Sequence, residues 1–67
     1  MHFEIRGDCI ELLKLLKASG LCGSGGEAKI CIDEGEVFVD GVQEFRKRCK
    51  IVRGQRIEFN GEELIVE

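Results

Sequence analysis

The sequence contains no proline, no tryptophan and no tyrosine, and it has only one histidine. Because tryptophan and tyrosine are missing, the sequence does not support an extended aromatic platform for the stacking of several bases. The single histidine, His2, lies at the N-terminus, so no Ser-His-Asp set is available for nucleophilic catalysis. A glycine-rich phosphate loop of the GxxxxGK type is also missing. These absences argue against an enzyme.

Long apolar runs are missing as well. The longest candidate, residues 10–18, is interrupted by Glu11, Lys14 and Lys17, whereas a membrane-spanning helix needs roughly 20 apolar residues. The first eight residues, MHFEIRGD, lack the basic start and apolar block of a signal peptide. We therefore expect a cytoplasmic protein without a membrane segment. Its 67 residues are expected to form one complete domain, 1–67, with a thin core.

Cysteine is comparatively frequent, but its spacing does not favour a metal site. The four cysteines, Cys9, Cys22, Cys31 and Cys49, contain no C-x-x-C pair of the kind that structural zinc sites usually use. We expect free thiols that act as small apolar side chains, with no metal and no cofactor. A zinc, iron–sulfur or redox protein is the alternative. Cys49 lies among cations, which would lower its pKa if it were exposed, although a buried thiol is the favoured interpretation.

The N-terminal residues predict a strand followed by a helix. Residues 2–6 alternate between polar and apolar side chains, which is typical of a short edge strand. Residues 8–20 predict a helix with Asp8 and Glu11 as an acidic capping box and Gly20 at its end. Its apolar face would consist of Ile10, Leu12, Leu13 and Leu16.

A second helix is predicted from residue 24 to residue 35. Ser24 followed by Glu27 forms a capping box, and Lys29 and Asp33 have the spacing of an i,i+4 ion pair. Ala28, Cys31 and Ile32 would face the core.

The C-terminal half predicts β-structure. Asp40-Gly41 and Asn60-Gly61 each separate two extended stretches and are strong signals for hairpin turns. Phe38 alternates with its neighbours, and we expect it to pack within the sheet or under a helix, with an exposed ring for base stacking as the alternative. The element order β-α-α-β-β-β-β indicates an α+β fold, in which two short helices pack on a small, mostly antiparallel sheet with β-hairpins.

The charge distribution is strongly uneven along the chain. The formal net charge is −3, yet six of the ten basic residues lie between positions 46 and 56, where no acidic residue occurs. Like charges on one segment repel each other, which a polyanion would relieve. The alternatives are that the cations are merely solvated or that they pair with acids such as Glu27 and Glu44. The six residues are Arg46, Lys47, Arg48, Lys50, Arg53 and Arg56.

The start of the second helix is a further candidate site. Gly25 and Gly26 would leave the unpaired backbone amides of the first helical turn open to a phosphate. Two glycines at this position could instead permit a close approach of neighbouring backbone. Lys14, Lys17 and Lys29 would lie on exposed helical faces, where lysines commonly serve solubility.

The strings SGGEAKICIDEGEVFVDG and EFRKRCKIVRGQ resemble the S4-type RNA-binding domain, named for a small-subunit ribosomal protein. The resemblance extends over about residues 8–60, and it is strongest to the free-standing bacterial form, the YbcJ/YaaA-like proteins. It implies the αL motif, with two helices leading into a sheet that contains a β-hairpin. Many relatives have an arginine near the start of the second helix, where this chain has glycine. The resemblance therefore implies that RNA contacts come mainly from the backbone amides there and from residues 46–50.

The resemblance also implies a function and a site. We expect a non-enzymatic, monomeric module that binds structured RNA, ribosomal or transfer, in ribosome assembly or translation, mainly through phosphate contacts and shape. A protein-interaction module that docks an acidic partner is the alternative. The implied RNA-binding residues are Lys14, Lys17, Ser24, Gly25, Gly26, Lys29, Arg46, Lys47, Arg48, Lys50 and Arg53.

Overall fold

The structure is a computed structural model that describes residues 1–67. Two tight turns in it each join a pair of neighbouring strands in the main sheet. Asp40-Gly41 and Asn60-Gly61 each join two antiparallel strands, and all four residues have φ angles between 51° and 82°. Positive φ at both central residues defines the type I′ turn, which Asp-Gly and Asn-Gly favour. Both predicted hairpins are therefore confirmed.

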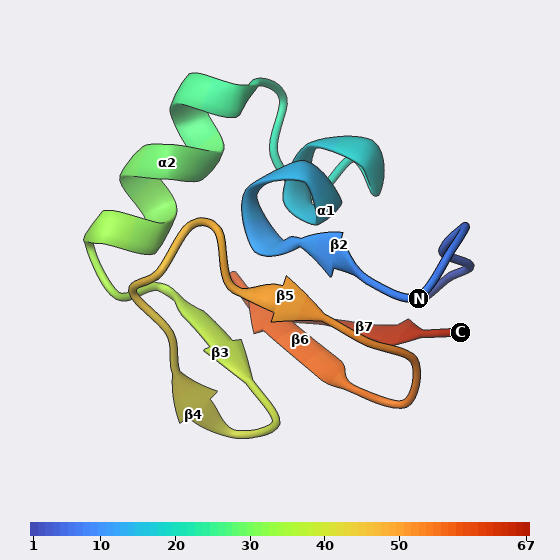
Figure 1. Cartoon of the computed structure of the whole chain (residues 1–67). Coiled ribbons are helices and arrows are strands. Elements are labelled where there is room, and N and C mark those ends of the chain that lie inside the picture. Colours follow the sequence, from blue (N-terminus) through green and yellow to red (C-terminus); the bar gives the residue numbers. More distant parts are fainter.

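The chain forms two helices and seven short strands (Figure 1). They are β1 (His2–Phe3), β2 (Ile10–Glu11), α1 (Leu12–Ala18), α2 (Gly25–Asp33), β3 (Val37–Val39), β4 (Val42–Gln43), β5 (Lys50–Ile51), β6 (Arg56–Phe59) and β7 (Glu62–Val66). Five of the strands form a sheet in the order β1-β7-β6-β3-β4, in which only the β1–β7 pair is parallel. The predicted α+β fold with a mostly antiparallel sheet is confirmed.

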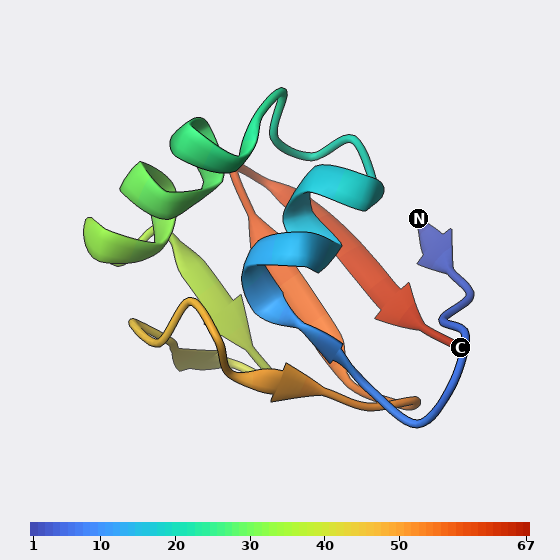
Figure 2. The same ribbon diagram turned by 45° about the horizontal axis from the view of Figure 1, so that its top comes forward.

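One strand pair was not predicted. β2 and β5 form a separate antiparallel pair, in which Ile10 lies opposite Ile51 and Glu11 opposite Lys50. This pair and both helices lie on the same face of the main sheet (Figures 1 and 2). We refer to the opposite face of the main sheet as the outer face.

The predicted start of the first helix is wrong. α1 begins at Leu12, its N-cap is Glu11 in an extended conformation, and no side chain caps it. Asp8 cannot cap the helix because Ile10 and Glu11 are extended in β2, which separates it from the first turn. The unpaired amides of that turn instead bond to backbone carbonyls of a distant loop. Gly20 does follow the end of α1, with a φ of +82°, as predicted.

The second helix begins as predicted. The Oγ of Ser24 accepts a hydrogen bond of 3.2 Å from the backbone N–H of Glu27. The Glu27 carboxylate in turn accepts one of 3.2 Å from the N–H of Gly23. The predicted Lys29–Asp33 pair does not form, because no ion pair within 4.0 Å joins these side chains.

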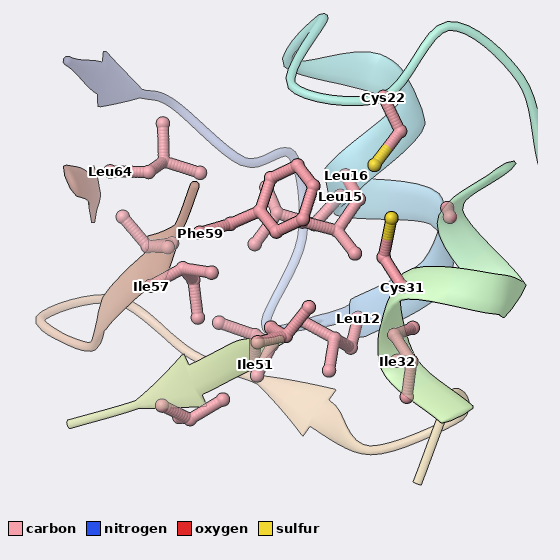
Figure 3. Close-up of a cluster of buried hydrophobic side chains, with 14 of the residues drawn as sticks. Leu12, Leu15, Leu16, Cys22, Cys31, Ile32, Ile51, Ile57, Phe59 and Leu64 are labelled. Atoms are coloured by element: carbon pink, nitrogen blue, oxygen red, sulfur yellow. The ribbon is translucent and has the colours of Figure 1, made fainter. Parts of the chain in front are cut away.

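The core lies between the helices and the inner face of the main sheet (Figure 3). It includes Leu15, which the predicted apolar face omitted, whereas Leu13 and Ile10 are only half-buried. Figure 3 shows the thiols of Cys22 and Cys31 pointing toward one another beside α1 and α2. All four cysteines are free, and burial raises the pKa of the Cys22 thiol to about 11. The two buried thiols therefore fill space as small apolar groups.

Phe38 does not pack as predicted. Its neighbours Val37 and Val39 are buried on the inner face, so the alternation of the strand places the Phe38 ring on the outer face, where it is 37% exposed. Its cross-strand neighbour there is Glu58.

We expect Gly35→Ala to destabilise the fold more than Gly61→Ala. Both glycines have positive φ, at +74° and +78°, so alanine adds about 1 kcal/mol of backbone strain at each. Nothing lies within 4 Å of a Cβ at position 61, but at position 35 a Cβ would collide with the Gln43 side chain and lie 3.0 Å from the Phe45 ring. Urea denaturation should show a larger loss for Gly35→Ala, and equal losses would contradict the tight contact.

Candidate nucleic-acid interface

The basic loop, residues 44–49, is fixed to the first turn of α1 by backbone hydrogen bonds. The N–H of Leu12 donates to the carbonyl of Cys49 at 2.8 Å, and the N–H of Leu13 donates to the carbonyl of Lys47 at 2.9 Å. These carbonyls satisfy amides that the start of a helix leaves without partners. In Figures 1 and 2 the loop lies between the C-terminal end of α2 and the first turn of α1. The loop therefore has a defined position on the helix side of the molecule.

A carboxylate clamp stabilises the loop from within. Glu44 receives three hydrogen bonds of 3.0 Å from Arg46: one from its backbone N–H, one from Nε and one from Nη2. The Glu44 side chain is only 16% exposed. Its bonds with Arg46 lower its pKa to about 2, against the opposing effect of burial. Arg46 is thus engaged within the protein, and its charge is compensated by Glu44.

Three other cations, in the loop or directly after it, have no carboxylate partner within ion-pair distance. Lys47, Arg48 and Lys50 form no ion pair within 4.0 Å, and Arg48 and Lys50 are exposed while Lys47 is half-buried. Lys50 lies opposite Glu11 in the β2–β5 pair, and Glu11 is 3.7 Å from the amino group of Lys14. We call Lys47, Arg48 and Lys50 the free cations. The backbone bonds from Leu12 and Leu13 place the loop backbone beside the first turn of α1, the turn that contains Lys14.

Arg53 and Arg56, the remaining basic residues between positions 46 and 56, lie outside the basic loop. The Nη2 of Arg53 donates a hydrogen bond of 3.0 Å to the carbonyl of Ile5, which ties it to the N-terminal segment. Arg56 lies on the outer face, with its Nε 3.3 Å from Glu58 and 3.8 Å from Glu63. The six clustered cations of the sequence therefore do not form one continuous surface, and Arg56 is neutralised by two carboxylates.

The first turn of α2 lies at the end of that helix away from the basic loop (Figure 1). A Cβ on Gly25 would meet nothing within 4 Å, and one on Gly26 would meet only the Oγ of Ser24 at 4.0 Å. Close approach of other backbone therefore does not explain the two glycines. The Glu27 carboxylate already lies at this positive end of the helix, where it would oppose a phosphate.

Two lysines of the predicted site remain isolated in the structure. Lys17 and Lys29 are exposed, on α1 and α2 respectively, and neither forms an ion pair. No hydrogen bond joins either side chain to the basic loop.

The structure gives no support to an activated thiol at Cys49. Burial and the neighbouring Glu44 carboxylate raise the pKa of Cys49, and these effects outweigh the opposing influence of Arg46.

No group of three or more histidine, cysteine, aspartate or glutamate side chains is arranged to hold a metal ion. Neither helix has the length and apolar character needed to cross a bilayer.

The backbone bonds between the loop and α1 were not foreseen from the sequence, and Glu44 was considered only as one of several possible acid partners. The sequence does contain a signal for the Glu44–Arg46 clamp. Glu44 precedes Arg46 by two residues, and at this spacing its carboxylate can reach both the backbone amide and the guanidinium of Arg46. The carbonyls of Lys47 and Cys49 have no signal of this kind, because every residue carries a carbonyl.

The geometry of two helices, a basic loop and a hairpin-containing sheet matches a known family. The family model of the S4 domain matches residues 3–67, and the chain belongs to this family. The protein YbcJ of Escherichia coli (strain K12) is 58% identical over 52 residues, which are 78% of this chain and 74% of YbcJ. YbcJ of Shigella flexneri matches to the same extent.

Solved structures agree with this assignment. The solution structure of Escherichia coli YbcJ, which has an αL motif involved in RNA binding, covers 97% of this chain with a TM-score of 0.75 and 48% identity, and 84% of YbcJ is matched. The ribosomal protein S4e of Thermoplasma acidophilum covers 87% of this chain with a TM-score of 0.74 and 27% identity. The chain corresponds to 31% of that longer protein. The predicted αL fold and S4-type assignment are confirmed.

We expect Glu44→Gln to lower the free energy of unfolding at pH 7. The folded-state pKa of Glu44 is depressed from 4.5 to about 2, so its ionised form stabilises the fold above pH 4.5. This contribution should disappear as the pH falls from about 4.5 through about 2. Denaturation of both proteins across this range should show the stability difference shrinking.

Glu62→Gln is a suitable control, because Glu62 is exposed, forms no ion pair and loses the same charge. A Glu44→Gln deficit that is unchanged between pH 7 and pH 2 would show that the clamp does not depend on the ionised carboxylate.

Proposed function

We propose that this chain is a non-enzymatic module that binds structured RNA, ribosomal or transfer, in ribosome assembly or translation. The observation that carries the proposal is the position of the free cations. Lys47 and Arg48 lie in a loop whose backbone is bonded to α1, Lys50 follows it in β5, and none of the three forms an ion pair with a carboxylate. Membership of the S4 family and the involvement of the YbcJ αL motif in RNA binding support the same proposal.

Phosphate recognition follows from the chemistry of the free cations. The guanidinium of Arg48 can donate two parallel hydrogen bonds to one phosphate, while Lys47 and Lys50 act as point charges. Because the loop is anchored at both Lys47 and Cys49, little backbone entropy is lost when RNA binds. Preorganised cations therefore contribute more to affinity than the same charges on a mobile segment would.

This contact chemistry favours structured RNA without strong sequence preference. The deep, narrow major groove of an A-form helix excludes side chains, so a protein reads such RNA through its backbone and shape. Phosphate contacts position the protein but carry no base information. RNA is accordingly recognised through the spacing of its phosphates around the free cations and Lys14. Arg46 contributes by holding the loop in place.

We expect Arg48→Ala to weaken binding to a duplex-containing RNA while Arg56→Ala leaves it nearly unchanged. Both variants remove one arginine, but Arg48 is unpaired whereas Arg56 is compensated by Glu58 and Glu63. In the triple variant Lys47→Ala, Arg48→Ala, Lys50→Ala, the slope of log K against log salt should flatten by about two to three, at roughly 0.7–0.9 per lost phosphate contact. Fluorescence anisotropy at several salt concentrations measures both quantities.

Equal losses for Arg48→Ala and Arg56→Ala would contradict the proposed surface. If the wild-type chain instead forms a stoichiometric protein complex that survives nuclease and binds no RNA, the alternative of an acidic protein partner is supported. Circular dichroism of every variant confirms that the fold is retained.

A further inference from the structure

Phe45 is the most exposed aromatic residue of the chain. The residue is 55% exposed, compared with 37% for Phe38 and 8% for Phe59 in the core. It lies in the basic loop, directly between the two residues of the Glu44–Arg46 clamp. Folding gains little from an apolar ring left largely in water, so burial in this chain does not account for it.

The ring is exposed but its position is restricted. The backbone before it is held by a hydrogen bond of 2.9 Å from the N–H of Glu44 to the carbonyl of Val37, and the backbone after it by the bond from Arg46 to Glu44. Its Cε1 lies 3.0 Å from where a Cβ on Gly35 would be, so the ring rests against the backbone at the end of α2. A ring supported in this way loses little freedom when a second flat group packs against it.

The charges around Phe45 favour a nucleotide over an apolar protein segment. The free cations Lys47 and Arg48 follow it by two and three residues on the same anchored loop. The acids Glu34 and Glu36 are the chain neighbours of Gly35, against which the ring rests. An uncharged base can lie against the ring beside these acids, while the phosphates on either side of it lie toward the free cations.

We propose, resting on the RNA-binding function above, that Phe45 stacks on an unpaired base next to the duplex that the free cations hold. The site would therefore prefer RNA with an unpaired nucleotide at a helix end, loop or bulge over a blunt duplex. Phe38, the other exposed ring of the chain, lies on the outer face between Gln43 and Glu58 and not in the basic loop, so it does not take this role.

The test uses the full chain and two synthetic RNA hairpins, one with a blunt end and one with an unpaired adenine overhang. Wild-type protein should bind the overhang hairpin more tightly. Phe45→Ala should lose about fivefold to a hundredfold in affinity for that hairpin and almost nothing for the blunt one. Phe45→Leu, which keeps the apolar bulk, should lose nearly as much, and Phe38→Ala should behave as wild type.

Phe45→Trp provides a direct readout, because the chain has no other tryptophan. A stacked base should quench its emission with the overhang hairpin but not with the blunt one, and affinity should be retained. If wild type binds both hairpins and Phe45→Ala keeps the overhang preference, the role of Phe45 is overturned while RNA binding stands. If wild type binds neither hairpin, the proposed function itself fails.

Discussion

The candidate interface depends on two backbone hydrogen bonds, from the amides of Leu12 and Leu13 to the carbonyls of Cys49 and Lys47. A helix start needs partners for its first amides, and here a loop more than thirty residues away in the sequence supplies them. The same bonds hold the basic loop against α1, so helix capping and placement of the free cations are one interaction. The β2–β5 pair continues this attachment through Glu11 and Lys50.

Separation of charge explains how an acidic chain can present a cationic surface. The outer face carries Glu58 and Glu63, which neutralise Arg56, whereas the basic loop lies on the helix side of the sheet. The shortest dimension of the molecule is 19 Å, and charges are screened over about 8 Å at physiological ionic strength. Carboxylates on the outer face therefore have little influence on a phosphate held at the opposite side. The net charge of −3 does not determine what the loop attracts.

The sequence predicted those parts of the fold that local chemistry determines. Asp40-Gly41, Asn60-Gly61 and the Ser24 cap each act within a few residues, and the structure confirms all three. The start of α1 was placed at Asp8 because the capping pattern is local, while the competing β2–β5 pairing joins Ile10 to Ile51 and Glu11 to Lys50, far apart in the sequence. Phe38 was expected to pack in the sheet or under a helix, with an exposed ring as the alternative, and strand alternation places it on the outer face.

The sequence shows which basic residues are clustered, but the positions that these residues take in the fold were harder to predict. The sequence indicated where basic residues concentrate, and the family resemblance implied a set of RNA-binding residues that stays a prediction. Neither the sequence nor the resemblance showed that Glu44 engages Arg46 or that Arg56 lies on the outer face. Neither showed that the first turn of α2 is remote from the basic loop. Each of these depends on which strand face or helix end a residue occupies after tertiary packing. The free cations are thus a smaller set than the basic segment suggested.

The most direct test of this account is a nuclear magnetic resonance titration of the isotope-labelled chain with a duplex RNA hairpin. The account predicts that amide shifts concentrate at residues 46–50 and at the first turn of α1, while Glu58, Glu63 and the rest of the outer face remain unperturbed. Shifts centred on the outer face, or a complex that leaves residues 46–50 unchanged, would contradict the claim that the anchored loop is where RNA binds.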